Sequence, residues 1–482
     1  MSTICSTRFQ NKRTRFNEGY VTVFFTISIA LIMSLFIGMF YSVRENAIRM
    51  RTVAVADTAM TSIFAEYNKQ LWEQYGLVFV DASYMTDSTG MKLTEDHLKA
   101  IINKNFDECR LELIGGKDLL KLNCTETEAM AVCLATDQNN KAIKHQAVNL
   151  MKYHYKIAYI DRAKEWAGVV KEHNLSGGAH YDEAFRAADK LNSKYGIDYS
   201  GWLPSITGGN DISEDNISGF GILSLITDSG KISTTKINKD NYVSKRQLNK
   251  GNLERNYDEE ITDYFFLREY MMHKCGNYLR NKPDSVLTYQ TEYLVTGKGS
   301  DSDNLAGVAG RIMVLREAAN MITLTSDSGK MEMIDGICAA IAAVLTVPEV
   351  ADILKAIVIA CWVNYESLTD MKVIFAGGRI PLIKTGDQWI TDLNSALYGG
   401  NNADSSDDGL SYEDYLRIFV YMTGEEKLLM RLSDIIEMDV RSTPGNEYFR
   451  LDNCFDAWEA QIYVTSKHGY DFTAVRRRYV YN

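Results

Sequence analysis

The sequence lacks the short motifs that mark several enzyme classes. The Gly-Lys pairs at Gly230, Gly297 and Gly329 all lack a glycine five residues earlier, so no phosphate-binding G-x-x-x-x-G-K-[ST] loop is present. Neither H-E-x-x-H nor G-x-S-x-G occurs, and the seven histidines do not cluster. These absences argue against a P-loop nucleotidase, a zinc metalloprotease and a serine hydrolase. We expect no cofactor.

Paired cysteines and complete metal-binding loops are also missing. The eight cysteines include no C-x-x-C pair, which excludes a zinc ribbon and a thioredoxin-like motif. Buried thiols are expected, with one disulfide among Cys109, Cys124 and Cys133 as the alternative. Two acidic segments, 301–304 and 404–409, lack the full calcium loop of an EF-hand. Both are expected to precede helices and to cap their free N–H groups.

Charged residues are absent from 21–41, a run of 21 residues. A helix needs about 20 apolar residues to cross a hydrocarbon core of about 30 Å, so this run predicts a transmembrane helix. A cleaved signal peptide is the alternative, but its apolar part is shorter, about 7–15 residues, and 40–44 offers no small-residue cleavage site. Ser34 and Gly38 form a small-xxx-small pattern through which such helices pack. We expect an uncleaved anchor in membrane lipid.

The charge distribution predicts the orientation of this anchor. Residues 1–20 carry four basic side chains and one acidic side chain, Glu18, so the positive-inside rule predicts a cytoplasmic N-terminus and an extracytoplasmic remainder. The net charge is −11, and because residues 1–20 contribute +3, the rest carries −14. An acidic body argues against DNA or RNA as a partner, since nucleic-acid binding needs a basic face.

The segment after the anchor predicts a continuation of the same helix. Residues 42–75 contain no Gly or Pro, and apolar residues from Met60 to Tyr75 recur at steps of three and four. We expect an unbroken helix up to Gly76, followed by a short buried strand at 77–80. A membrane helix that continues into a globular domain and packs on its first strand is the layout of a pilin-like subunit.

The remaining chain predicts a mixed body, so the expected fold class is α+β and predominantly helical. An apolar region, 333–362, is divided by Pro348 and charged residues into pieces too short to span a membrane, which predicts a buried helical hairpin. Ser411 and Asp414 resemble a capping box. The other expected elements are helices at 96–113, 142–172, 182–195, 261–280 and 305–323, a strand at 288–295, and a hairpin of strands at 462–465 and 472–481.

We therefore predict five segments along the chain. They are a cytoplasmic basic N-terminus at 1–20, a transmembrane helix at 21–41, a pilin-like helix with the first globular part at 42–195, a loop or boundary at 196–258, and a second globular part at 259–482.

Several segments carry a resemblance to a known family. They are Gly19 to Phe24 (GYVTVF), 62–68, 71–81 (LWEQYGLVFVD), 304–320 (NLAGVAGRIMVLREAAN), 375–384 (FAGGRIPLIK) and 410–416 (LSYEDYL). Together they resemble TadE/TadG-like proteins, and more narrowly a Gram-positive branch with a domain of unknown function. The resemblance implies a minor pilin-like or assembly subunit of a tight-adherence (Flp-type) pilus locus.

The family also has a processing signal, from which this chain departs. Processed members have a cleavage glycine followed, at the fifth mature position, by a glutamate. If Gly19 is that glycine, the fifth residue after it is Phe24, which has no carboxylate. The departure fits TadG-like members, which stay in the membrane as accessory subunits.

We therefore expect a non-enzymatic, single-pass membrane protein that serves pilus assembly or surface adhesion. Its expected partners are membrane lipid, pilus or assembly-platform proteins, and further copies of itself. One alternative is a membrane-anchored cell-wall hydrolase that uses two carboxylates among Glu66, Asp81, Glu317 and Glu366, although their spacing selects no pair. Another is an extracytoplasmic sensor or scaffold.

Overall fold

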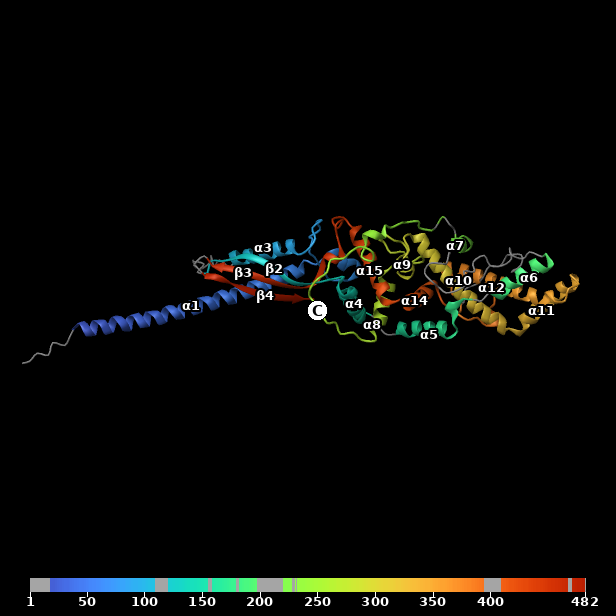
Figure 1. Ribbon diagram of the computed structural model, residues 1–482, viewed down its shortest axis with the longest axis horizontal. Coiled ribbons are helices and arrows are strands. Elements are labelled where there is room, and N and C mark those ends of the chain that lie inside the picture. The colour runs from blue at the N-terminus through green and yellow to red at the C-terminus, as the bar shows by residue number, and fades with distance from the viewer. Residues whose placement is uncertain are drawn as a thin grey trace, which may run out of the picture. The chain divides into compact units, whose positions relative to one another are not determined.

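The computed structural model describes residues 18–108, 120–154, 158–178, 182–196, 220–227, 230, 232–393, 409–466 and 470–481. These residues form two compact units, which we call unit 1 and unit 2. Unit 1 takes its residues from Met1–Ala65, Thr94–Met130 and Glu459–Tyr479, and unit 2 from Glu66–Leu93, Ala131–Trp458 and Val480–Asn482. The fold is mostly helical with a small antiparallel sheet, which confirms the predicted class (Figure 1).

Unit 1 is built around the second half of one long helix, α1 (Glu18–Ala65). It also contains α3 (Lys92–Glu108) and most of three strands, β2 (Leu122–Leu134), β3 (Cys454–Ser466) and β4 (Tyr470–Val480). The ring of Phe64, which is 2% exposed, lies 4.4 Å from that of Tyr479 on β4. Asp57 forms an ion pair with Arg477 at 2.7 Å. This half of α1 therefore packs on β4 (Figure 1).

The first half of α1 has no such packing. Its most apolar stretch of 18 residues has a mean hydropathy of 2.4, and none of it is buried. Thr26 and Ser34 return their hydroxyls to the carbonyls of Val23 and Leu31 at 2.9 and 2.8 Å, as expected for polar side chains in an apolar helix. Within the described ranges, α1 is the one helix long and apolar enough to cross a membrane, and such a helix suits an anchor or a signal sequence.

The prediction of one unbroken helix up to Gly76 is wrong. Helix α1 ends at Ala65, and α2 (Lys69–Tyr75) begins after Asn68. The side chain of Asn68 accepts a hydrogen bond from the Leu71 N–H at 2.9 Å, so it caps a new helix instead of continuing the old one. Gly76, with a φ of 69°, ends α2 as predicted, because glycine adopts the left-handed conformation without strain.

The predicted strand at 77–80 is shorter and later than expected. Strand β1 (Val80–Asp81) pairs antiparallel with β3, with Val80 opposite Phe455. The sheet order is β1-β3-β2, and β4 also pairs with β3. The predicted C-terminal hairpin is confirmed as β3 and β4, although both strands are longer than the alternation indicated.

Unit 2 is mainly helical, and its helices bury one large apolar core and a smaller one. Its helices are α2, α4 (Asp137–His154), α5 (Ala158–Glu172), α6 (Asp182–Tyr195), α7 (Phe220–Ile226), α8 (Asp263–Lys274), α9 (Gln290–Thr296), α10 (Asp301–Ser326), α11 (Ser328–Val344), α12 (Val350–Phe375), α14 (Tyr412–Met422) and α15 (Glu425–Arg441), with short 3-10 turns at η2 (Leu175–Gly177), η5 (Lys239–Asn241), η6 (Gly386–Gln388) and η7 (Leu451–Asn453).

Several predicted elements are confirmed in unit 2. Helix α6 has the predicted bounds, and the 333–362 region forms the hairpin of α11 and α12, of which α11 buries one face. Ser411 caps α14 by accepting from the Asp414 N–H, while the Asp414 carboxylate accepts from the Ser411 N–H. Helices α4 and α5 cover 142–154 and 158–172 of the helix expected at 142–172, and α3 covers 96–108 of the one expected at 96–113, whereas 155–157 and 109–113 lie outside the described residues.

The strand expected at 288–295 is wrong, because this segment contains helix α9. Its Thr, Tyr and Val side chains have high strand propensity, but tertiary packing decides, and all seven residues of α9 are buried. One of them, Glu292, accepts hydrogen bonds from the Tyr278 N–H and the Tyr412 hydroxyl at 2.8 and 2.7 Å through Oε1. Its Oε2 has no hydrogen-bond partner in the described structure.

Glu292 should make the stability of unit 2 depend on pH. Burial raises the pKa of this carboxyl from 4.5 to about 7. The folded chain therefore holds a proton that the unfolded chain releases, and stability falls as pH rises from about 4.5 to 7, by about 3 kcal/mol. We expect Glu292→Gln to raise the free energy of unfolding by up to about 3 kcal/mol at pH 8 relative to the wild type, and to change it little near pH 4.5.

Urea unfolding followed by tryptophan fluorescence tests this prediction, since all six tryptophans fall in the residue ranges of unit 2. Glu332→Gln, at an exposed position of α11, is the matched control and should give the same difference from wild type at both pH values. An equal effect of Glu292→Gln at pH 4.5 and pH 8 would contradict the assignment.

Candidate functional site

The predicted anchor residues all lie on α1. Gly19 is its second residue, and the Phe24 side chain is 62% exposed. Ser34 and Gly38 are exposed on the helix, and a Cβ placed at Gly38 would meet nothing within 4 Å. Cleavage at Gly19 and helix packing through Ser34 and Gly38 therefore stay predictions.

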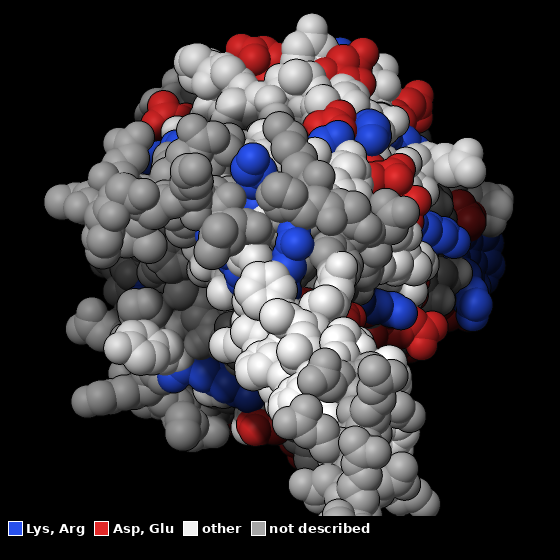
Figure 2. Space-filling view, turned by 90° about the vertical axis from the view of Figure 1, so that its left-hand side faces the viewer, with Lys and Arg blue, Asp and Glu red and all other residues white. Residues whose placement is uncertain are grey.

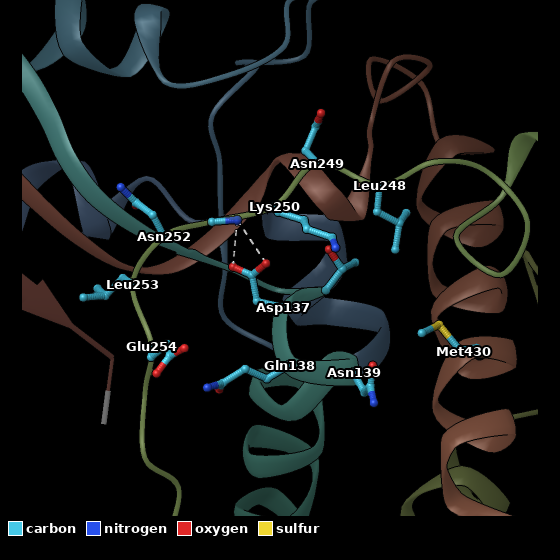
Figure 3. Close-up of a pocket in the computed structure, with 12 residues that line it drawn as sticks. Asp137, Gln138, Asn139, Leu248, Asn249, Lys250, Asn252, Leu253, Glu254 and Met430 are labelled. Carbon is cyan, nitrogen blue, oxygen red and sulfur yellow. Dashed lines mark hydrogen bonds between the residues drawn. The ribbon is translucent and has the colours of Figure 1, made fainter.

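A second candidate site is a pocket of about 380 Å³ in unit 2. Its floor is the start of α4, its wall is the segment 248–254, and Met430 of α15 closes one side (Figure 3). Figure 3 shows the Asp137 carboxylate turned toward that segment, where it accepts two hydrogen bonds, at 3.0 and 3.1 Å, from the Gly251 N–H. Asp137 also accepts from the Leu134 N–H at 2.7 Å. One carboxylate thus joins the end of β2 to the pocket wall.

The backbone at the pocket floor has an unusual conformation. Gln138, Asn139 and Asn140 have φ values of 52°, 59° and 63°, so three consecutive residues form a left-handed turn. Each such residue costs roughly 1–2 kcal/mol relative to the right-handed form, and Asn tolerates it best among residues with a side chain. Strain of this kind persists where surrounding contacts impose it and is concentrated at functional sites.

The pocket lining suits hydrogen bonding to a small polar group. Four carboxamides line it, from Gln138, Asn139, Asn249 and Asn252. The Thr136 hydroxyl, on a side chain that is 6% exposed, has no partner among the described atoms. Burial raises the pKa of Asp137. Hydrogen bonds from the N–H groups of Leu134 and Gly251 lower it, but the effect of burial is larger.

Gly251 should be essential to this arrangement. A Cβ there would overlap the Val132 carbonyl oxygen and the Asp137 carboxylate. Because backbone and a hydrogen-bonded side chain would both have to move, we expect Gly251→Ala to lower the free energy of unfolding of unit 2 by about 2–3 kcal/mol in a urea titration. The control is Gly336→Ala on α11, where a Cβ meets nothing within 4 Å. That substitution should stabilise by about 0.5–1 kcal/mol, and equal effects of the two would contradict the packing argument.

The four carboxylates considered for a hydrolase lie in unit 2 with separate hydrogen-bond partners. Glu66 is exposed and accepts from the Tyr84 hydroxyl at 3.2 Å, and Asp81 accepts from the Ser83 N–H and hydroxyl. Glu317 accepts from Asn364 at 2.9 Å. Glu366 accepts from the N–H groups of Ile390 and Thr391, both at 2.9 Å, and from Lys384.

The acidic segment 301–304 forms the first turn of α10 and does not precede the helix as predicted, because the cap is Ser300. Ser300 accepts from the Asp303 N–H at the start of α10, and Asp301 accepts from the N–H groups of Thr288 and Tyr289. Most of the segment 404–409 lies outside the described residues. The described side chains contain no group of three His, Cys, Asp or Glu residues that is arranged to hold a metal ion. Six cysteines are free thiols, whereas Cys5 and Cys109 lie outside the described residues.

Three segments that carry the sequence resemblance meet at a buried arginine. Arg316, from 304–320, is fully buried and donates to the carbonyls of Pro381 and Leu382, from 375–384, at 2.7 and 2.9 Å. It also donates to the hydroxyl of Tyr415, from 410–416, at 3.3 Å. These segments are thus joined at one point in the core of unit 2.

The charge of Arg316 is balanced inside the same network. Its Nε and Nη2 donate to Asp370 Oδ2 at 3.0 and 2.7 Å, and Lys384 donates to Asp370 Oδ1 at 2.5 Å. Lys384 also pairs with Glu366. Two cations and two carboxylates, each at most 4% exposed, therefore neutralise one another. Such a closed network stabilises and orients the helices that carry it.

Sequence reasoning did not identify the pocket or this network. The run of amide side chains at 138–140 was a usable signal for the left-handed turn, because Asn favours that conformation. Gly251 and Arg316 had no local signal, since their roles depend on contacts with residues far away in the chain.

Comparison with known proteins places most of these features within one family. A model of a family of unknown function (DUF5702) matches residues 212–466, which is more than half of the 482-residue chain. The match includes the pocket wall, Met430 and the whole Arg316 network, and it does not include α1. No curated protein and no solved structure matches the chain. The chain belongs to the family of unknown function DUF5702.

Proposed function

We propose that this chain is a non-enzymatic, single-pass membrane subunit that serves tight-adherence pilus assembly or surface adhesion. The observation that carries the proposal is the division of α1 into an apolar, unburied half and a half that packs in unit 1. One rigid helix that is both the anchor and the central element of a small α+β unit is the layout of pilin-like subunits. The resemblance of residues 19–24, 62–68 and 71–81 to TadE/TadG-like proteins supports the same proposal.

In this proposal α1 crosses the membrane with its N-terminus in the cytoplasm, and both units lie outside. Phe24 replaces the glutamate that processing and filament entry require, so the chain stays anchored as an accessory subunit. Its partners are pilus or assembly-platform proteins, and Ser34 and Gly38 provide a surface for self-association within the membrane.

Deletion of the gene tests the proposal in the strain that carries it. We expect loss of surface pili and of adherence, and restoration of both by the full-length chain. Normal pili and normal adherence in the deletion strain would contradict the proposal. A second measurement addresses enzymatic activity: peptidoglycan turnover by the purified full-length chain, abolished by a single substitution at Glu66, Asp81, Glu317 or Glu366, would establish a hydrolase instead.

A further inference from the structure

We propose that the pocket formed by the start of α4, the segment 248–254 and Met430 binds an uncharged oligosaccharide. This pocket, which we call the α4 pocket, has a volume of about 380 Å³, within the range of about 300–1,000 Å³ that is typical of small-molecule sites. All of its lining residues belong to unit 2. The inference goes beyond the proposed function, and it does not depend on whether α1 spans a membrane.

A buried hydroxyl in the lining of the α4 pocket has no partner in the described part of the chain. It is Thr136 Oγ1, on a side chain that is 6% exposed. Asn140, the third residue of the left-handed turn, is fully buried, and its Oδ1 also has no partner there. Its Nδ2 donates to Sδ of Met430, which lines the pocket, at 3.4 Å. Because buried polar atoms are nearly always hydrogen-bonded, these two oxygens indicate a ligand that supplies hydroxyl groups.

Carboxamides on two sides of the α4 pocket match the hydroxyl groups of a sugar. Gln138 and Asn139 lie on the floor, and Asn249 and Asn252 lie on the wall (Figure 3). The wall pair is held in place, since Asn249 Nδ2 donates to Asn453 at 2.8 Å and Asn252 Oδ1 accepts from a backbone N–H of β2 at 2.9 Å. A carboxamide both donates and accepts, and so does a hydroxyl group, so the two can pair in either direction.

The rest of the lining favours a neutral ligand with an apolar face. Lys250 carries a positive charge, and Asp137 and Glu254 carry negative charges, so the lining is not a cluster of one sign that would select a phosphate or a polycation. Leu248 and Met430 lie on the side toward α15 and add apolar surface (Figure 3). A sugar ring presents hydroxyl groups at its edge and C–H groups on its face, which suits this combination.

A peptide is another ligand that carboxamides can bind, but the wall of the α4 pocket disfavours it. A peptide that lies along an extended segment pairs with free backbone N–H groups of that segment. The N–H groups of Asn249 and Gly251 donate to the side chains of Asp452 and Asp137, and that of Leu253 donates to a carbonyl of β2, each at 3.0 Å. The wall therefore offers a ligand its side chains and not a strand edge.

A neighbouring pocket gives room for more than one sugar ring. Asn249 and Lys250 line both the α4 pocket and this second pocket, which has a volume of about 270 Å³. The second lining adds the hydrogen-bonding side chains of Thr89 and Asn453 and also lies within unit 2. Two pockets that share a pair of residues favour an oligosaccharide over a single sugar.

Binding of the purified full-length chain to a printed array of oligosaccharides tests the proposal. Figure 2 shows the described apolar half of α1 without charged side chains, so the chain is purified in a detergent. The detergent is zwitterionic, because a sugar headgroup would compete for the pocket. The array carries uncharged oligosaccharides of glucose, galactose, mannose and N-acetylglucosamine. We expect binding to at least one of them, and isothermal titration calorimetry then measures the affinity of each variant for the strongest one.

Two substitutions in the α4 pocket should each weaken this binding by about fivefold or more. Thr136→Val and Asn139→Gly each remove a hydrogen-bonding group. Both should leave the fold intact, because the Thr136 hydroxyl has no described partner to lose and glycine adopts the left-handed conformation of Asn139 without strain. The matched controls are Thr52→Val, at another buried hydroxyl without a described partner, and Asn174→Gly, at another left-handed asparagine. Neither control lines the pocket, so both should keep the wild-type affinity.

Three results would overturn the proposal. The first is absence of binding to every oligosaccharide on the array. The second is equal affinity of the pocket variants and their controls, which would locate the binding elsewhere. The third is displacement of the oligosaccharide by an equal concentration of a tripeptide of alanine, which would identify a peptide site.

A further measurement distinguishes the sources of the oligosaccharide. Retention of the wild type, but not of Thr136→Val, on purified cell walls of the same strain would place the ligand in the wall. Binding on the array without such retention would place it on another surface, and both results support the pocket. Because these measurements use purified protein, normal pili in the deletion strain would contradict the proposed function without changing their outcome.

Discussion

Asp370→Ala is expected to destabilise unit 2 by about 4 kcal/mol, the largest effect of any single substitution considered. Asp370 is fully buried on α12 and accepts from Arg316, Asn320 and Lys384. Removing the carboxylate leaves Arg316 without its ionic partner in the core, and breaking a buried ion pair in this way costs about 3–5 kcal/mol. Because small folded units have about 5–15 kcal/mol of stability, the variant should be close to unfolding at 37 °C.

Urea titration with tryptophan fluorescence measures this effect, since Trp362 and Trp389 pack together beside the network. The control is Asp352→Ala, an exposed acid in the first turn of the same helix, which should cost at most about 1 kcal/mol. Replacing the whole network with apolar residues of similar volume should cost less than Asp370→Ala, because no buried charge is then left unpaired. If Asp370→Ala and Asp352→Ala cost the same, the network does not stabilise the fold as described.

Ile32→Arg/Leu35→Arg is expected to abolish membrane integration. Both side chains lie near the centre of the span and are 54% and 59% exposed, so unit 1 gives them no alternative environment. An arginine at the centre of a membrane helix costs about 2.5–3.5 kcal/mol, so the pair costs about 6 kcal/mol. We expect less than a few per cent of the double variant to resist carbonate extraction, whereas the wild type stays in the membrane pellet.

The control for this prediction is Ile32→Leu/Leu35→Ile, which keeps the apolar character and should leave integration unchanged. The fold of units 1 and 2 is a second control. Because the substitutions lie outside the buried half of α1, both units should fold as in the wild type. Retention of the arginine variant in the carbonate pellet would show that membrane attachment does not depend on this helix.

Sequence reasoning predicted the features that depend only on residues close together in the chain. The charge-free run at 21–41, the stop of α2 at Gly76 and the capping box at Ser411 each require only neighbouring residues, and the structure contains all three features. The break at 66–68 was missed because an apolar stripe continues across it, while the capping side chain of Asn68 decides the local conformation.

Features that depend on distant contacts were not predictable. The segment 288–295 has a strand-like composition, yet Glu292 and its neighbours become helical because the surrounding core buries every residue of α9. The Arg316 network joins residues 54 and 99 positions apart, and the wall of the pocket lies 114 positions from Asp137. Neither periodicity nor motif spacing reports contacts of this kind, so sequence reasoning could place the long apolar helix but not the pocket.

The most direct test of the account is protease digestion of intact cells that carry the chain with a C-terminal tag. An antibody to residues 1–18 then sizes the fragment that remains in the membrane. We predict loss of the tag and a short retained fragment that contains residues 1–18, which is the pattern of an uncleaved anchor with its body outside. A protected tag would contradict the account by reversing the topology. A body that lacks residues 1–19 would contradict it by showing cleavage after Gly19 despite Phe24.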